Sequence, residues 1–61
     1  MIIKDITNIQ PEHMQWVLSN LARASMTTEN ITNTSVRATG EQSMWEIISL
    51  PSDVTITLVE E

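Results

Sequence analysis

The hydrophobic and polar positions of the chain change their period twice, and each period predicts a different element. Residues 1–9 are rich in isoleucine, which occurs on both alternating faces of this segment. Isoleucine favours β-strands, so we expect a first strand here. Lys4 and Asp5 lie in the middle of it. Charged side chains discourage unwanted strand pairing, so this strand suits the edge of a sheet.

The period becomes helical between Pro11 and Ser25. Pro11 suits the first helical position, where its missing N–H costs nothing. Gln10 then occupies the N-cap position, which glutamine seldom fills. The run from Thr27 to Asn30 favours a loop, so we expect the only long helix at about residues 11–26. The buried stripe follows the i, i+3, i+4, i+7 spacing and comprises Met14, Val17, Leu18, Leu21 and Ser25.

After residue 31 the period of the pattern is two, which is typical of strands. It predicts strands at 34–39, 43–50 and 54–59. Between the first two strands, a hairpin turn at Gly40 would need a positive φ. A second turn covers residues 50–53, where proline, serine and aspartate favour it. Two hairpins in succession would make these strands an antiparallel meander.

The predicted order of elements is β-α-β-β-β. We therefore expect the α+β fold class: a single small two-layer domain over residues 1–61, with an antiparallel C-terminal meander and one amphipathic helix packed on one sheet face. The chain contains no repeat, no linker and no motif specific enough to indicate a family. The predicted core comprises Val17, Leu18, Leu21, Val36, Trp45, Ile47, Val54, Ile56 and Leu58.

Trp16 is the most informative single residue of the sequence. At about 100° per residue, it points roughly 160° away from the centre of the apolar stripe. Its helical neighbours Glu12, Asn20 and Arg23 are polar. A large aromatic side chain on a polar face is typical of a contact residue, so Trp16, Glu12, Asn20 and Arg23 form the predicted protein-binding site. The alternatives are that the indole folds back over the helix edge, or that it covers Ile3 or another outward residue of the first strand.

Cysteine, histidine and glycine, on which many catalytic, metal-binding and phosphate-binding sites depend, are nearly absent. The chain has no cysteine, one histidine and one glycine. This composition removes thiolate and multi-histidine metal sites and glycine-rich phosphate loops. His13 is expected as a surface residue of the first helical turn, and Glu41 and Glu46 as solvated side chains. We therefore expect no enzyme activity, no cofactor and no metal.

The charge balance is acidic, because three Lys and Arg residues stand against eight Asp and Glu residues, which gives a net charge of −5. Nucleic-acid binding needs basic residues that neutralise phosphates, and anionic membranes attract basic segments, so we expect neither partner. We see no secretory signal and no run of about 20 apolar residues, which favours the cytoplasm of a bacterial host. The negative charge either keeps the protein in solution or steers it towards a basic partner.

These features together favour a small acidic protein that binds another protein. Such a chain is typical of regulators and inhibitors encoded by bacteriophages and mobile elements, which cover a functional, basic surface of a host protein. The alternative is a structural or assembly subunit that acts as a homo-oligomer. A domain of about 60 residues buries only about 60% of its unfolded surface. We therefore also expect a homodimer, in which the first or the last strand pairs across the two-fold axis.

Overall fold

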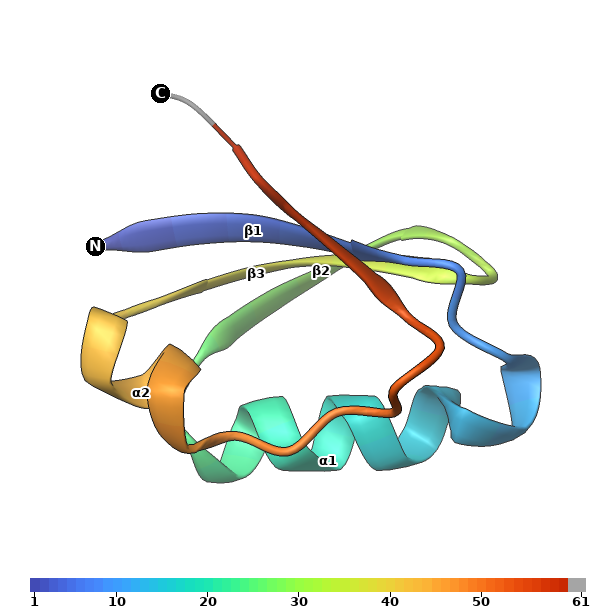
Figure 1. The fold of residues 1–61 in the computed structure, drawn as a ribbon, viewed down its shortest axis with the longest axis horizontal. Coiled ribbons are helices and arrows are strands. Elements are labelled where there is room, and N and C mark those ends of the chain that lie inside the picture. The colour runs from blue at the N-terminus through green and yellow to red at the C-terminus, as the bar shows by residue number, and fades with distance from the viewer. Residues whose placement is uncertain (60–61) are drawn as a thin grey trace.

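The computed structural model describes residues 1–59. Figure 1 shows the sheet as one layer, with α1 lying along one of its faces and the short α2 on the same side. The predicted α+β class, with a helix packed on an antiparallel sheet, is confirmed. The charged end formed by Glu60 and Glu61 lies outside the described residues. The elements are β1 (Ile2–Thr7), the 3-10 helix η1 (Pro11–His13), α1 (Met14–Arg23), β2 (Thr27–Thr32), β3 (Ser35–Gly40), α2 (Gln42–Ile47) and β4 (Thr55–Leu58).

The strands form one antiparallel sheet in the order β2-β3-β1-β4. β1 is therefore a central strand, whose Ile6 lies opposite Val36 of β3 on one side and opposite Ile56 of β4 on the other. The prediction of an edge position for this first strand was wrong. The C-terminal meander was also wrong, because the last strand crosses back to β1 instead of pairing with the segment before it.

Two charged residues of the central strand have specific partners, which explains why they are tolerated there. The ammonium group of Lys4 lies 5.0 Å from the ring centroid of Trp45, within the range of a cation–π interaction. Asp5 accepts hydrogen bonds from Nε of Arg37 at 2.8 Å and from its Nη2 at 3.2 Å. These hydrogen bonds and the positive charge of Arg37 hold the pKa of Asp5 below its usual value. The same hydrogen bonds and the negative charge of Asp5 raise the pKa of Arg37.

Both ends of α1 lie close to the predicted positions. Gln10 is the extended N-cap of η1 and makes no side-chain capping hydrogen bond. At the other end, Ser25 adopts a φ of 59°. The N–H of Met26 donates to the carbonyl of Leu21 at 3.1 Å, and the N–H of Ser25 donates to Ala22 at 3.0 Å. This pair of hydrogen bonds is a Schellman motif, which ends the helix after Arg23.

The segment after the helix, predicted as a loop, forms strand β2. In its register with β3, Thr28 lies opposite Ala38 and Glu29 lies opposite Arg37. Every residue of β2 is exposed, so no apolar alternation marks it in the sequence. Its threonines nevertheless favour an extended backbone, and β3 supplies the hydrogen-bonding partners that a loop would lack.

The predicted strand over residues 43–50 was also wrong, because most of it belongs to helix α2. Nε2 of Gln42 donates to Oε1 of Glu46 at 3.2 Å, an i, i+4 pair that supports a helix. Trp45 is buried under the sheet, and its Nε1 donates to the carbonyl of Ile2 at 3.2 Å. Trp45, together with Met44, which packs partly buried against the core, therefore holds α2 in position.

The core lies between α1 and the sheet. Predicted core residues that are buried are Val17, Leu21, Val36 and Trp45, whereas Leu18 and Val54 are half-buried against the core. Five further side chains complete the core. They come from β1, the turn that follows it, the residues just after α1 and β3. The buried core comprises Ile6, Ile9, Val17, Leu21, Ala24, Met26, Val36, Ala38 and Trp45.

Three predicted core residues are exposed instead. Ile47 is 72% exposed, Ile56 45% and Leu58 61%. Ile47 belongs to α2, where Trp45 supplies the buried contact. Ile56 and Leu58 belong to an edge strand, while α1 lies close to β2 at the opposite edge of the sheet. The helix therefore leaves the end of the sheet at β4 less covered.

Gly40 does not adopt the positive φ that a tight hairpin would require. It is the last residue of β3, and its lack of a side chain makes room for Met26. A Cβ at this position would lie 2.7 Å from Cε and 2.9 Å from Cγ of the buried Met26. Glycine is thus required by a close approach, and the prediction of a glycine-dependent turn was wrong.

Candidate protein-binding surface

Trp16 lies on the side of α1 that faces away from the core. The apolar stripe, including Val17 and Leu21, is turned towards the sheet and is fully buried. Trp16 keeps 46% of its surface exposed, so the predicted exposure is confirmed. Its indole packs edge-on against His13, with ring centroids 6.0 Å apart and an interplanar angle of 80°. Ile3 cannot be its partner. Side chains alternate between the two faces of a strand, so Ile3 lies on the opposite face of the sheet from the buried Ile6 and therefore from α1.

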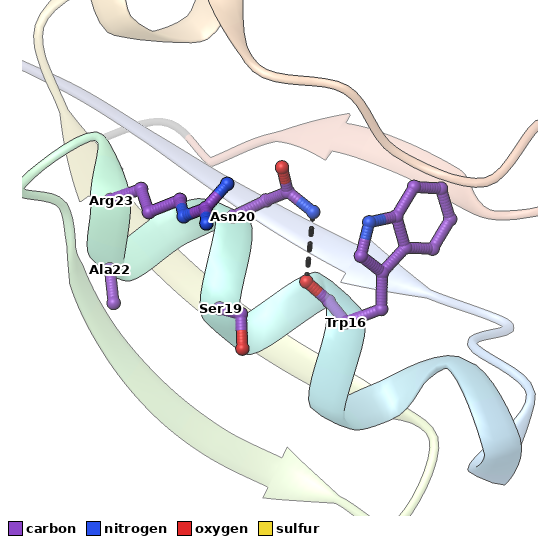
Figure 2. A pocket seen from close by; sticks show the side chains of 5 residues that line it. All are labelled: Trp16, Ser19, Asn20, Ala22 and Arg23. Atoms are coloured by element: carbon purple, nitrogen blue, oxygen red, sulfur yellow. Dashed lines mark hydrogen bonds between the residues drawn. The ribbon is translucent and has the colours of Figure 1, made fainter.

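A shallow depression of about 460 Å³ lies beside Trp16 on the helix surface. Figure 2 shows the side chains of Trp16, Asn20 and Arg23 extending from one side of α1. Nδ2 of Asn20 donates to the backbone carbonyl of Trp16 at 2.9 Å. This hydrogen bond orients the amide group within the helix, while the indole stands beside it. Ser19 and Ala22 complete the lining.

A second depression of about 210 Å³ continues the first towards α2. Asn20 and Arg23 line both depressions, and Ile47 and Ile48 line the second together with Ala24. We refer to the combined area, defined by Trp16, Asn20, Arg23 and Ile47, as the Trp16–Ile47 surface. It has an exposed apolar side chain at each end and two polar side chains between them.

Arg23 is the charged residue of the Trp16–Ile47 surface. The ion pairs found within residues 1–59 join Arg37 to Asp5 and the N-terminal amine to Glu41. The guanidinium of Arg23 is therefore not neutralised by a residue of that range. A hydrogen-bond acceptor on another molecule, such as a carbonyl or carboxylate, would satisfy its donors.

The structure brings together three of the four predicted site residues, namely Trp16, Asn20 and Arg23. Glu12 is exposed in η1 and lines neither depression. Sequence reasoning missed Ile47, because the segment that contains it was predicted as a core strand. The helix-favouring residues around it (glutamine, methionine and glutamate) were the signal that would have placed this isoleucine on a short helix.

His13, predicted as a surface residue of the first helical turn, is half-buried. Its Nδ1 is buried and has no hydrogen-bond partner in the described part of the chain. Within residues 1–59 there is no group of three or more His, Cys, Asp or Glu side chains that could hold a metal ion. None of the helices in that range is long and apolar enough to cross a membrane.

Comparison of the chain with family models, curated proteins and solved structures found no match.

Proposed function

We propose that this protein regulates or inhibits a partner protein by binding it through the Trp16–Ile47 surface and covering a functional part of it. The exposure of Trp16 supports this function most directly. A tryptophan side chain has a large apolar surface that burial would stabilise, yet 46% of Trp16 remains exposed. Tryptophan is also enriched in interface hot spots, where its truncation costs about 2 kcal/mol or more.

The chemistry around Trp16 also suits a protein partner. Binding surfaces combine apolar anchors with polar groups that fix the orientation of the partner. Trp16 and Ile47, which is 72% exposed, are the apolar anchors. Asn20 and Arg23 lie between them and offer an amide and a guanidinium to backbone or side-chain acceptors.

The net charge of −5 favours a partner with a basic surface. A field of this sign accelerates the approach of a basic molecule, and salt weakens the effect because it screens exposed charges. We therefore propose that binding becomes slower and weaker as the ionic strength rises. Chains of this size and charge without catalytic residues are typical of bacteriophage and mobile-element regulators, so we propose the bacterial cytoplasm as the place where it acts.

A retention experiment with matched variants tests this function. The immobilised wild-type protein, Trp16→Ala and Ile31→Ala are exposed to bacterial lysate, and retained proteins are identified by mass spectrometry. Ile31 is 47% exposed and lies on β2, so its exposure matches that of Trp16, and it lines neither depression. We expect one protein to be retained by the wild type and Ile31→Ala and to be lost with Trp16→Ala. Equal retention of the same proteins by all three would refute the role of the Trp16–Ile47 surface.

The alternative function, a structural subunit that assembles with itself, gives a different result in the same experiment. A homo-oligomeric subunit retains further copies of its own chain. No other protein is then retained in a comparable amount. Addition of tagged and untagged chains in equal amounts makes such copies visible. Capture of the untagged chain alone would favour assembly over regulation of a host protein.

A further inference from the structure

The outer edge of β4 has backbone hydrogen-bonding groups that no neighbouring strand uses. The N–H of Val59 donates to the carbonyl of Ile3 at 2.9 Å, which continues the ladder between β4 and β1. Bonded and non-bonded pairs alternate in an antiparallel ladder, so Thr57 also bonds to β1. The N–H and C=O groups of Ile56 and Leu58 then point the other way. Within residues 1–59, β4 is the last strand of the sheet on this side, so these groups face outward.

The side chains of this edge do not protect it from pairing. Edge strands are usually blocked by charged residues, proline or β-bulges. Thr55–Leu58 contains neither a charged residue nor proline, and Ile56 and Leu58 are 45% and 61% exposed. The opposite edge differs, since β2 carries Glu29 and an irregular register between Asn30 and Thr32. β4 is therefore the edge at which another strand can be added.

We propose that β4 of a second copy of this chain pairs antiparallel with β4 about a two-fold axis, which joins two four-stranded sheets into one. Thr57 lies on the axis, so Ile56 of each copy stands opposite Leu58 of the other. These are the residues whose N–H and C=O groups face outward, and each such pair exchanges two backbone hydrogen bonds. The same register places an exposed isoleucine against an exposed leucine twice, a favourable cross-strand contact.

The self-complementary pattern of β4 identifies a second copy as the occupant. Threonine and apolar residues alternate along Thr55–Leu58, so rotation about Thr57 places Ile56 opposite Leu58 and Thr57 opposite itself. Two copies of net charge −5 repel each other over long range. Salt screens this repulsion, so the dimer strengthens with ionic strength, whereas binding to a basic partner weakens. The two proposals therefore respond to salt with opposite signs.

A strand of this length makes a small interface, which sets the expected affinity. Stable complexes bury about 1,600 Å² in total, and weak ones less than about 1,200 Å². The four residues of β4 belong to the weak class. We expect a dimer in rapid exchange, with a dissociation constant in the high micromolar range.

Sedimentation equilibrium between about 10 μM and 1 mM tests the dimer, since this range brackets the expected dissociation constant. Leu58→Lys places a cation at each end of the contact and should raise the dissociation constant by about tenfold or more. Ile31→Lys is the matched control, because it changes an isoleucine of 47% exposure on the other edge strand, and it should leave the constant unchanged. Trp16→Ala should also leave it unchanged. A wild-type monomer across the whole range, or equal weakening by Ile31→Lys, would overturn the proposal.

Amide hydrogen exchange supplies a test that needs no variant. The amides of Thr57 and Val59 bond to β1 and should be protected at every protein concentration. Those of Ile56 and Leu58 should exchange rapidly in dilute solution and become protected as the dimer forms. A concentration-dependent protection of β2 amides, with Ile56 and Leu58 unprotected, would assign the contact to the other edge and refute pairing through β4.

Discussion

Replacement of Trp16 with alanine separates a contribution to binding from a contribution to folding. Trp16 is 46% exposed, so the fold covers about half of its surface, on the order of 100 Å². At about 25 cal/mol per Å², this area sets an upper limit of about 2.5 kcal/mol on its contribution to stability. Alanine keeps part of this burial and favours a helix by about 0.5 kcal/mol more than tryptophan. We therefore expect Trp16→Ala to lower the free energy of unfolding by only about 1 kcal/mol.

Leu21→Ala is the matched core variant on the same helix. Leu21 is fully buried, and truncation of a buried leucine to alanine costs about 2–5 kcal/mol because a cavity remains. Urea unfolding of both variants can be followed by the fluorescence of Trp45, which each of them retains. If Trp16→Ala lowers the free energy of unfolding as much as Leu21→Ala, Trp16 acts mainly in folding and the Trp16–Ile47 surface loses its anchor.

Three further predictions follow from the local geometry. Gly40→Ala should lower the free energy of unfolding by about 1–3 kcal/mol, because the new methyl group overpacks against Met26. In a Met26→Ala background the same Gly40→Ala substitution should cost less, as urea titration of the single and double variants would show. Ser25→Gly should raise the free energy of unfolding by up to about 1 kcal/mol, seen as a higher urea midpoint, because glycine adopts the φ of 59° without the steric penalty of a side chain. The pKa of Asp5 is lowered in the fold by Arg37, so its stabilising contribution is present above the unfolded pKa and is lost as the pH falls below about 4. Thermal melts of the wild type and Asp5→Asn at low ionic strength should therefore converge as the pH falls below that value, and parallel curves would count against the ion pair.

The sequence predicted the elements whose burial produces a regular pattern. The stripe from Met14 to Leu21 identified α1, because a helix on a sheet buries one face. The alternation between Val54 and Val59 identified β4 although all four of its residues are exposed, because its isoleucine and leucine alternate with threonines. β2 could not be found in this way, since it is exposed on both faces and its stability comes from backbone pairing with β3.

Alternation alone also cannot specify which strands pair. The position of β4 beside β1 depends on the path that the chain takes through α2, and Trp45 fixes that path by its hydrogen bond to Ile2. The same helix explains the partial prediction of the site. Trp16, Asn20 and Arg23 share one long helix and could be grouped by angle, whereas Ile47 approaches them only through the tertiary structure.

Site-specific photo-crosslinking in bacterial cells tests the binding role of the Trp16–Ile47 surface most directly. A photoreactive phenylalanine analogue replaces Ser19, which lines the depression beside Trp16, or Thr28, an exposed residue of β2, as the control. We predict a covalent adduct with one host protein from position 19, its loss when Trp16→Ala is added, and no such adduct from position 28. The same adduct from position 28 alone, or an adduct from position 19 that survives Trp16→Ala unchanged, would contradict binding through this surface.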